Sequence, residues 1–323
     1  MYQPPFEITP RIIELISEIS EKVGEINSIS NSASVVKLRK ENRIKTIHSS
    51  LAIENNSLSL EQMTAILQGK NVLGSPVEIL EVKNAIEAYE LLLSLDSCSE
   101  GDLLKAHRLM MQGLVDVAGK YRRGNVGIFG GGKVVHVAPP ADRVPSLMSD
   151  LFSWLAESKD HPLIKACVFH YEFEFIHPFQ DGNGRLGRLW HTVILKDWKE
   201  IFAWLPVETL IKQNQEKYYD ALARSDRSAK STAFIEFMLG VILATIVEII
   251  ETEEVTTKVT RKVTTNQKKI IEAIKANPFA TQEELASMLG ITRKNVVENM
   301  KKLQEMGLVK RVGATKNGYW QAK

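Results

Sequence analysis

The stretch HPFQDGNGRLGR, residues 177–188, decides most of what the sequence indicates about the fold. The segment before it, residues 166–176, carries apolar side chains at helical spacing, and Pro178 disfavours helix at the preceding His177. A buried helix is therefore expected to end there. A further apolar stripe predicts a second helix from about Arg185. The stretch is interpreted as a helix, a tight turn and another helix.

The polar residues of this turn suit a chain of phosphates. Gly182 and Gly184 lack a Cβ, so the backbone can aim its N–H groups at an anion, and the following helix adds its positive end. Arg185 and Arg188 lie three apart on one helix face, and their planar guanidinium groups match phosphate oxygens. The turn is predicted to bind the phosphates of a nucleotide.

Two neighbouring side chains could take part in chemistry there. Asp181 is a single carboxylate beside the predicted phosphate site, and Mg²⁺ is typically held by one or two carboxylates together with phosphates and waters. His177, at the mouth of the loop, can accept a proton near neutral pH. The spacing of His170 to His177 fits no zinc pattern, so we interpret His170 as a packed helical histidine.

Most of the remaining chain is predicted to be helical. Capping signals and apolar periodicity predict helices that start at Pro10 and cover about 36–54, 59–69, 80–95 and 103–115. The exception is VGIFGGGKVVHV, residues 126–137, in which two β-type runs flank three glycines. It nearly matches a phosphate-binding P-loop, but Val134 stands where that loop needs a hydroxyl. We therefore interpret this stretch as a β-hairpin.

Composition and charge narrow the class of protein. The net charge of the chain is +2, but residues 256–323 contain 14 Lys and Arg and 5 Asp and Glu, so this part carries +9 and the rest −7. Cys98 and Cys167 are far apart, which suits a reducing cytosol. The first ten residues lack signal-peptide features, and the longest apolar run, 237–247, is too short to span a bilayer. A cytoplasmic protein without a membrane partner is expected.

The basic C-terminal part is predicted to be a winged helix-turn-helix. Helices are expected at about 267–276, at 281–290 after a capping box, and from Thr292 to Gly307, followed by a hairpin wing around Asn317-Gly318. A basic exposed face on such a domain is typical of DNA binding. A basic face is also often only solvated, and winged helices also serve as protein-binding modules. The basic residues expected on the third helix and the wing are Arg293, Lys294, Lys301, Lys302, Lys310, Arg311 and Lys316.

Residues 177–188 match the signature HPFx(D/E)GNGRxxR at every fixed position, so the chain resembles the Fic family over about residues 1–250. The resemblance implies a mainly α fold, namely a Fic-type helical bundle with a small β-hairpin flap, here joined to a C-terminal winged helix-turn-helix. The expected domains are an N-terminal helical region, 1–95, a catalytic core, 96–252, a polar linker, 253–266, and the winged domain, 267–323.

The resemblance also implies an activity. Fic enzymes usually transfer AMP from ATP to a Ser, Thr or Tyr hydroxyl of a protein and release pyrophosphate. By that likeness His177 is the general base, Asp181 holds Mg²⁺, and Phe179 anchors the loop in the core. The residues implied to bind ATP and its phosphates are Gly182, Asn183, Gly184, Arg185, Leu186, Gly187 and Arg188.

Two further groups of residues take their roles from the same likeness. The hairpin resembles the flap that lays a target segment across the site by strand pairing, with Val126, Gly127, Ile128 and Phe129 on its first arm. The residues at the positions of the family's adenine contacts are Tyr218, Tyr219, Leu222 and Asp226. The family commonly has an asparagine in place of Asp226, and the two tyrosines could instead belong to the core.

A second family pattern, (S/T)xxxE(G/N), is matched by Ser50, Glu54 and Asn55. On a helix around 36–55, Ser50 and Glu54 share one face. The resemblance implies that Glu54 pairs with Arg188, which then cannot bind the γ-phosphate, so the α-phosphate is misplaced for attack. The position of the pattern marks the subclass whose inhibitory helix precedes the catalytic core.

Three hypotheses follow. The first is an autoinhibited protein adenylyltransferase, a nucleotidyltransferase that uses ATP and Mg²⁺ on a protein substrate, which could be itself. The second is a DNA-binding regulator whose Fic core senses nucleotide. The third is a Fic enzyme that removes AMP or uses another phosphate donor. Family habit adds a homodimer as the expected assembly.

Overall fold

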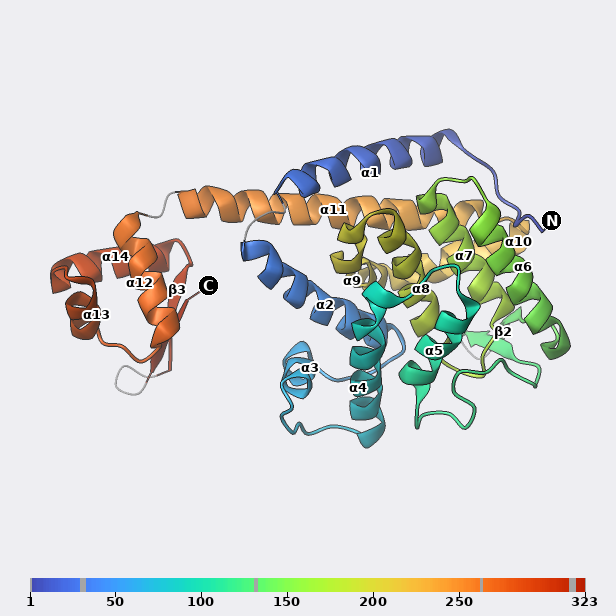
Figure 1. Ribbon diagram of the computed structural model, residues 1–323, viewed down its shortest axis with the longest axis horizontal. Helices are drawn as coiled ribbons and strands as arrows, with labels where there is room; N and C mark the ends of the chain where they lie inside the picture. The colour runs from blue at the N-terminus through green and yellow to red at the C-terminus, as the bar shows by residue number, and fades with distance from the viewer. Residues whose placement is uncertain (1, 30–32, 131–132, 262–263, 314–317, 323) are drawn as a thin grey trace. The chain divides into compact units, whose positions relative to one another are not determined.

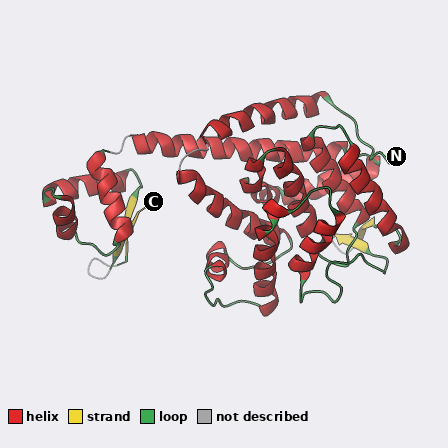
Figure 2. Ribbon diagram, in the orientation of Figure 1, coloured by secondary structure: helices red, strands yellow, loops and turns green. Residues whose placement is uncertain are grey.

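The computed structural model describes residues 1–323 except 1, 30–32, 131–132, 262–263, 314–317 and 323. The chain divides into two compact units, Met1–Glu248 and Ile249–Lys323. Helices dominate the described residues, and strands occur as one short pair in each unit (Figure 1, Figure 2). The predicted fold class, mainly α with a hairpin and a winged helix, is confirmed.

The first unit is a helical bundle with one hairpin. Its helices are α1 (Pro10–Ile29), α2 (Ala33–Ile53), α3 (Leu60–Leu67), α4 (Pro76–Glu90), α5 (Glu100–Met111), α6 (Val144–Glu157), α7 (Pro162–Ile176), α8 (Asn183–Trp198), α9 (Val207–Gln213), α10 (Gln215–Ser228) and the part of α11 (Thr232–Arg261) up to Glu248. The hairpin pairs β1 (Gly127–Gly130) with β2 (Lys133–Val137). Short 3₁₀ turns cover Leu92–Ser94, Ala141–Arg143 and Glu200–Trp204.

The helices α7 and α8 form the centre of this unit. They pack against each other and carry the largest fully buried side chains, including Phe169, Phe173 and Trp190. The α7 helix is buried on nearly all sides, so its apolar residues surround the helix rather than forming one stripe, and the polar His170 and Glu172 are buried with them. Because the loop between α7 and α8 is held by this core at both ends, the core fixes the positions of the motif residues.

Two helix starts differ from the sequence prediction. The α4 helix begins at Pro76, not near Leu80, because proline is favoured in the first helical turn, and it ends at Glu90. The α8 helix begins at Asn183, two residues before Arg185, because Gly182 adopts the left-handed conformation (φ 84°) that ends the turn. The earlier start brings Gly184 into the first turn of the helix.

The stretch predicted as a linker, 253–266, is helical through Arg261 as the end of α11. Its threonines and valines lower helix propensity only slightly, and extending an existing helix requires no new nucleus. By length and composition the segment Thr232–Thr252 could also span a bilayer, so the apolar stretch is longer than the sequence analysis recognised. Within the first unit Ile235, Met238 and Ile242 are fully buried, which accounts for the apolar character of the helix.

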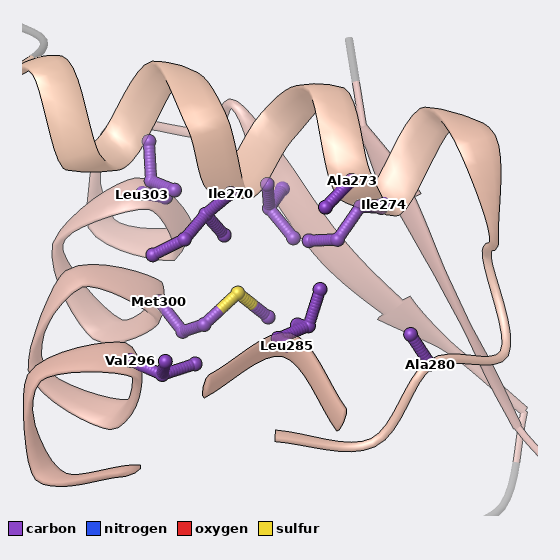
Figure 3. Packing of buried hydrophobic residues seen from close by; sticks show 9 residues of the cluster. Ile270, Ala273, Ile274, Ala280, Leu285, Val296, Met300 and Leu303 are labelled. Atoms are coloured by element: carbon purple, nitrogen blue, oxygen red, sulfur yellow. The ribbon is translucent and has the colours of Figure 1, made fainter. Parts of the chain in front are cut away.

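The second unit contains the predicted winged helix-turn-helix. Its elements are α12 (Thr265–Ala276), α13 (Gln282–Leu289), α14 (Arg293–Glu305), β3 (Val309–Val312) and β4 (Tyr319–Ala322). Side chains from its three helices, among them Ile270, Leu285 and Met300, point toward one another in a compact core (Figure 3). The predicted turn residue Asn317 and the basic Lys316 lie outside the described residues.

Candidate active site

The loop between α7 and α8 is closed by its own asparagine. His177 ends α7 in the left-handed conformation (φ 49°, ψ 61°) and its N–H donates to the Phe173 carbonyl at 2.9 Å. The Asn183 amide accepts from the Phe179 N–H and donates to the Phe179 carbonyl, both at 2.9 Å. The side chain of Asn183 therefore holds the loop, and only its backbone is left for the phosphate contact predicted from the sequence.

Phe179 anchors this loop in the core, as predicted. It is fully buried and stacks on His107 of α5, with ring centroids 3.7 Å apart. His107 Nδ1 accepts from the Gly119 N–H at 2.8 Å, which leaves the proton on Nε2 to donate to the Asp181 carbonyl at 3.0 Å. Burial lowers the pKa of His107 to about 4, so this histidine is a neutral support of the loop.

Arg122 is a second support that the sequence analysis missed. The guanidinium group of Arg122 is buried between the hairpin and the loop and donates at 2.8 Å to the His177 carbonyl. It also donates to carbonyl groups of Ile176, Gly124 and Pro139. Arg122 thereby connects the segments that flank the two strands of the hairpin to the end of α7.

Arg188 is held by the end of α2, as the sequence predicts. Its Nη2 donates to the Glu54 Oε1 at 2.8 Å and to the Ser50 carbonyl at 3.0 Å, and its Nε donates to the Ser50 Oγ at 3.1 Å. The side chain of Arg188 is 2% exposed, and that of Glu54 is 34% exposed. Burial is the largest single influence and disfavours the charge on Arg188, but Glu54, with smaller contributions from Tyr218 and Glu174, raises the pKa of the arginine overall.

The Glu54 carboxylate also lies against the first turn of α8. A Cβ placed on Gly184 would come within 2.5 Å of the Glu54 Oε1 and 3.1 Å of an Arg188 nitrogen. Only glycine leaves room for this approach. A carboxylate oxygen of Glu54 therefore lies beside the first turn of α8, near the end of the helix that favours an anion.

Arg185 is buried and held by two carboxylates, and its predicted contact with phosphate stays a prediction. Its Nη1 donates to the Glu81 Oε1 of α4 at 2.8 Å, and its Nη2 donates to the Asp181 Oδ1 at 3.2 Å. The side chain of Arg185 is 5% exposed. No sequence signal pointed to Glu81, because 104 residues separate the two partners.

Asp181 offers one carboxylate to a metal ion. Its Oδ1 accepts from Arg185 and from the Gly182 N–H, while the side chain as a whole is 60% exposed. Among the described residues, no group of three or more His, Cys, Asp or Glu side chains could hold a metal. The donor set therefore fits Mg²⁺ only if phosphates and waters supply the remaining ligands.

The hairpin predicted as a flap is present. Gly127 pairs with Val137 and Ile128 with His136, and a bulge follows between Ile128 and Phe129. In the described part of the chain β1 and β2 form a sheet of two strands, so each has an edge that could accept a further strand.

The four residues predicted to contact adenine share α10 but differ in their surroundings. Tyr218 is buried and its hydroxyl lies 3.1 Å from the His170 Nε2, so it belongs to the core. Tyr219 is half exposed, Leu222 is partly buried, and Asp226 accepts from the Tyr171 hydroxyl at 2.9 Å. Adenine contact by these last three stays a prediction. His170 is fully buried, as expected for a packed helical histidine.

Comparisons with known proteins agree with this geometry. Residues 97–195 match the model of the Fic/DOC family, and residues 264–310 match that of the winged helix-turn-helix DNA-binding family. A crystal structure of a Fic family protein from Desulfovibrio desulfuricans G20 is 46% identical with a TM-score of 0.77, covering 100% of this chain and 98% of that one.

Two curated relatives are named as adenylyltransferases. Protein adenylyltransferase Fic of Aedes aegypti is 32% identical over an alignment of 232 positions. The alignment covers 66% of this chain and 44% of the relative. A probable protein adenylyltransferase of Aquifex aeolicus (strain VF5) is 28% identical and covers 83% of this chain and 82% of its own. The chain thus spans less than half the length of the mosquito relative.

A glycine turn at a helix start, with two buried arginines and a histidine at its entrance, is the arrangement that the matched motif predicts. The matched motif and the similarity along the whole chain identify the family to which the protein belongs. The chain belongs to the Fic family and carries a C-terminal winged helix domain.

Proposed function

We propose that this protein is a protein adenylyltransferase that transfers AMP from ATP to a Ser, Thr or Tyr hydroxyl of a protein. One observation carries the proposal: the full motif at 177–188 folds as a glycine turn at the start of α8, with His177 at its entrance, and a helix start of this kind favours a bound anion. The names of the mosquito and Aquifex relatives support the same activity.

The residues can be assigned to the steps of this reaction. His177 takes the proton of the incoming hydroxyl, whose oxygen attacks the α-phosphorus in line. The bond from the α-phosphorus to the bridging oxygen breaks, and pyrophosphate leaves. The N–H groups after Gly182 and the positive end of α8 stabilise the charge that develops on the phosphates. Asp181 would hold Mg²⁺, which neutralises phosphate charge when it is bound.

The contact between Glu54 and Arg188 restrains this activity. The carboxylate and an outer phosphate compete for the same guanidinium and for the same helix start. While Glu54 stays in place, ATP binds with its phosphates displaced, and a small displacement of the reacting centre lowers the rate strongly. The protein with this contact intact is therefore proposed to be autoinhibited.

The test is transfer of label from ATP to protein. The full chain and its Glu54→Gly variant are incubated with Mg-ATP labelled in the α- or the γ-phosphate, and the added mass is determined. Label from the α-phosphate, with the mass of one AMP and absent in His177→Ala, supports the proposal. Label from the γ-phosphate would instead support phosphoryl transfer. Folded variants that bind Mg-ATP but never become labelled would contradict it.

A second candidate function, DNA binding, is favoured by the winged helix unit. Residues 264–310 match a DNA-binding family, and the α14 side chains of Arg293, Lys294, Lys301 and Lys302 are exposed. A basic exposed third helix is the usual means of reading the major groove. The Arg311 guanidinium of the wing lies over the Trp320 ring at 4.8 Å, so this charge is held against the domain.

A gel shift with mixed-sequence DNA tests this function in the full chain. Charge reversal at Lys301 and Lys302 should weaken binding and flatten its salt dependence. The matched control reverses Lys268 and Lys269, two exposed lysines of α12 in the same unit. Absence of binding at low salt would exclude DNA and leave a protein partner for this domain.

A further inference from the structure

The segment after the inhibitory helix is held by one side chain amide. Asn55, the second residue after α2, adopts the left-handed conformation (φ 68°) and turns the chain. Asn56 follows and is buried. Its Nδ2 donates to the Glu81 Oε2 at 2.8 Å and to the Glu78 carbonyl at 3.2 Å, and its Oδ1 accepts from the Leu58 N–H at 3.1 Å. The amide therefore has both its donor and its acceptor committed.

Glu81 connects this amide to the catalytic motif. One oxygen of its carboxylate accepts from Asn56, and the other accepts from the Arg185 Nη1 at 2.8 Å. One turn earlier on α4, the Glu78 Oε1 accepts from the Ser57 N–H at 2.6 Å. The end of α2 and the start of α8 are thus fixed to the same face of α4, and α2 packs against both helices (Figure 1).

The inhibitory contact depends on where α2 ends. Glu54 lies two residues before Asn56, and its carboxylate must reach Arg188 at 2.8 Å while it lies closely over Gly184. We propose that Asn56 and Glu81 form a latch that holds Glu54 in this position and so sets the strength of the restraint. The regulatory part of this inference rests on the proposed adenylyltransferase function, whereas the latch is a property of the fold.

Donor and acceptor can be exchanged between positions 56 and 81, and this exchange distinguishes the loss of the latch from a general loss of stability. Asn56→Asp places a carboxylate opposite Glu81 while keeping the acceptor for Leu58. Glu81→Gln keeps an acceptor for Arg185 but turns a donor toward the Asn56 donor. In the double variant the amide introduced at position 81 can donate to the carboxylate introduced at position 56, so the hydrogen bond is restored in reverse. If the two substitutions acted independently, their effects would add in the double variant. If the two side chains form one hydrogen bond, the double variant should recover toward the wild type.

Hydrogen exchange in the full chain tests the latch without any need for activity. In each single variant, amides at the end of α2 should exchange on the order of ten-fold faster, as expected when a hydrogen bond to a charged group is lost. Mg-ATP should bind on the order of ten-fold more tightly, and the double variant should return toward the wild type in both measurements. Glu87→Gln, an exposed change on the same helix, should alter neither.

Labelling from α-phosphate ATP connects the latch to regulation. Asn56→Asp should raise labelling in the wild-type background and add nothing in a Glu54→Gly background. Unchanged exchange in both single variants, or a double variant worse than either, overturns the latch. If exchange and Mg-ATP affinity respond but no variant becomes labelled, including Glu54→Gly, the latch stands and the proposed function fails.

Discussion

Replacing Glu54 by glycine should have opposite effects on the free and the nucleotide-bound protein. The variant loses a charge-assisted hydrogen bond of 2.8 Å to an arginine whose side chain is 2% exposed. Such a bond contributes about 1.5–3 kcal/mol when buried, and the 34% exposure of the Glu54 side chain reduces this to about 1–2 kcal/mol. For a unit of this size, the melting temperature without nucleotide should fall by roughly 2–8 °C.

Mg-ATP should reverse the sign of this effect. In the variant, Arg188 and the start of α8 are available to phosphate without first breaking the contact with Glu54. The affinity of the variant for Mg-ATP should therefore be about 5- to 30-fold higher than that of the wild type, which corresponds to the same free energy. Thermal unfolding with and without Mg-ATP, together with calorimetric titration, measures both quantities. Glu54→Gln, which removes the charge but keeps the size, should lie between the variant and the wild type. A folded Glu54→Gly protein with wild-type stability and wild-type affinity for Mg-ATP would refute the competition.

Three further perturbations test other parts of the site. Glu208 lies on α9, where its Oε1 accepts from the Tyr89 hydroxyl at 3.3 Å. Burial raises the pKa of Glu208 to about 7, so the folded protein binds its proton more tightly than the unfolded chain does, and stability falls as the pH rises from about 4.5 to 7. Glu208→Gln should remove up to about 3 kcal/mol of that decline, and parallel denaturation curves for the two proteins across this range would contradict it. Phe179→Ala should lower the free energy of unfolding by about 3–5 kcal/mol, measured by denaturant titration, since it removes a fully buried ring that stacks on His107. Gly182→Ala adds a Cβ at φ 84° and 2.6 Å from the Met111 sulfur, so a loss of at least about 1–2 kcal/mol is expected, and an alanine variant as stable as the wild type would show that the turn can relax.

The parts of the site that the sequence predicted are those with local signals. Pro178, the glycines of the turn and the capping residues fix where helices start and end, because they act on the backbone of their own neighbours. The contact between Glu54 and Arg188 came from a family pattern, and the structure places both atoms 2.8 Å apart. The first prediction needed only local signals, whereas the second took the packing of helices 134 residues apart from the family resemblance.

The parts that the sequence did not predict depend on packing between distant segments. Glu81, His107 and Arg122 reach the motif across 104, 74 and 55 residues, and nothing in their own surroundings in the sequence indicates such partners. The sequence also contains no sign of the two carboxylates that hold Arg185, since they come together only in the folded chain. The helical end of α11 was taken as a linker because propensity was weighed without the preceding helix.

The position of Arg122 has a consequence for how a target is presented. Its single guanidinium group spans the carbonyls on both sides of the hairpin and the carbonyl of His177. In the proposed reaction, with a target bound along the hairpin, this one rigid planar ion would set the distance between the incoming hydroxyl and the His177 imidazole. Lysine, with three donors on one nitrogen, has no geometry that reaches these acceptors together. Accuracy in choosing the modified residue would then depend on a side chain that never touches the target.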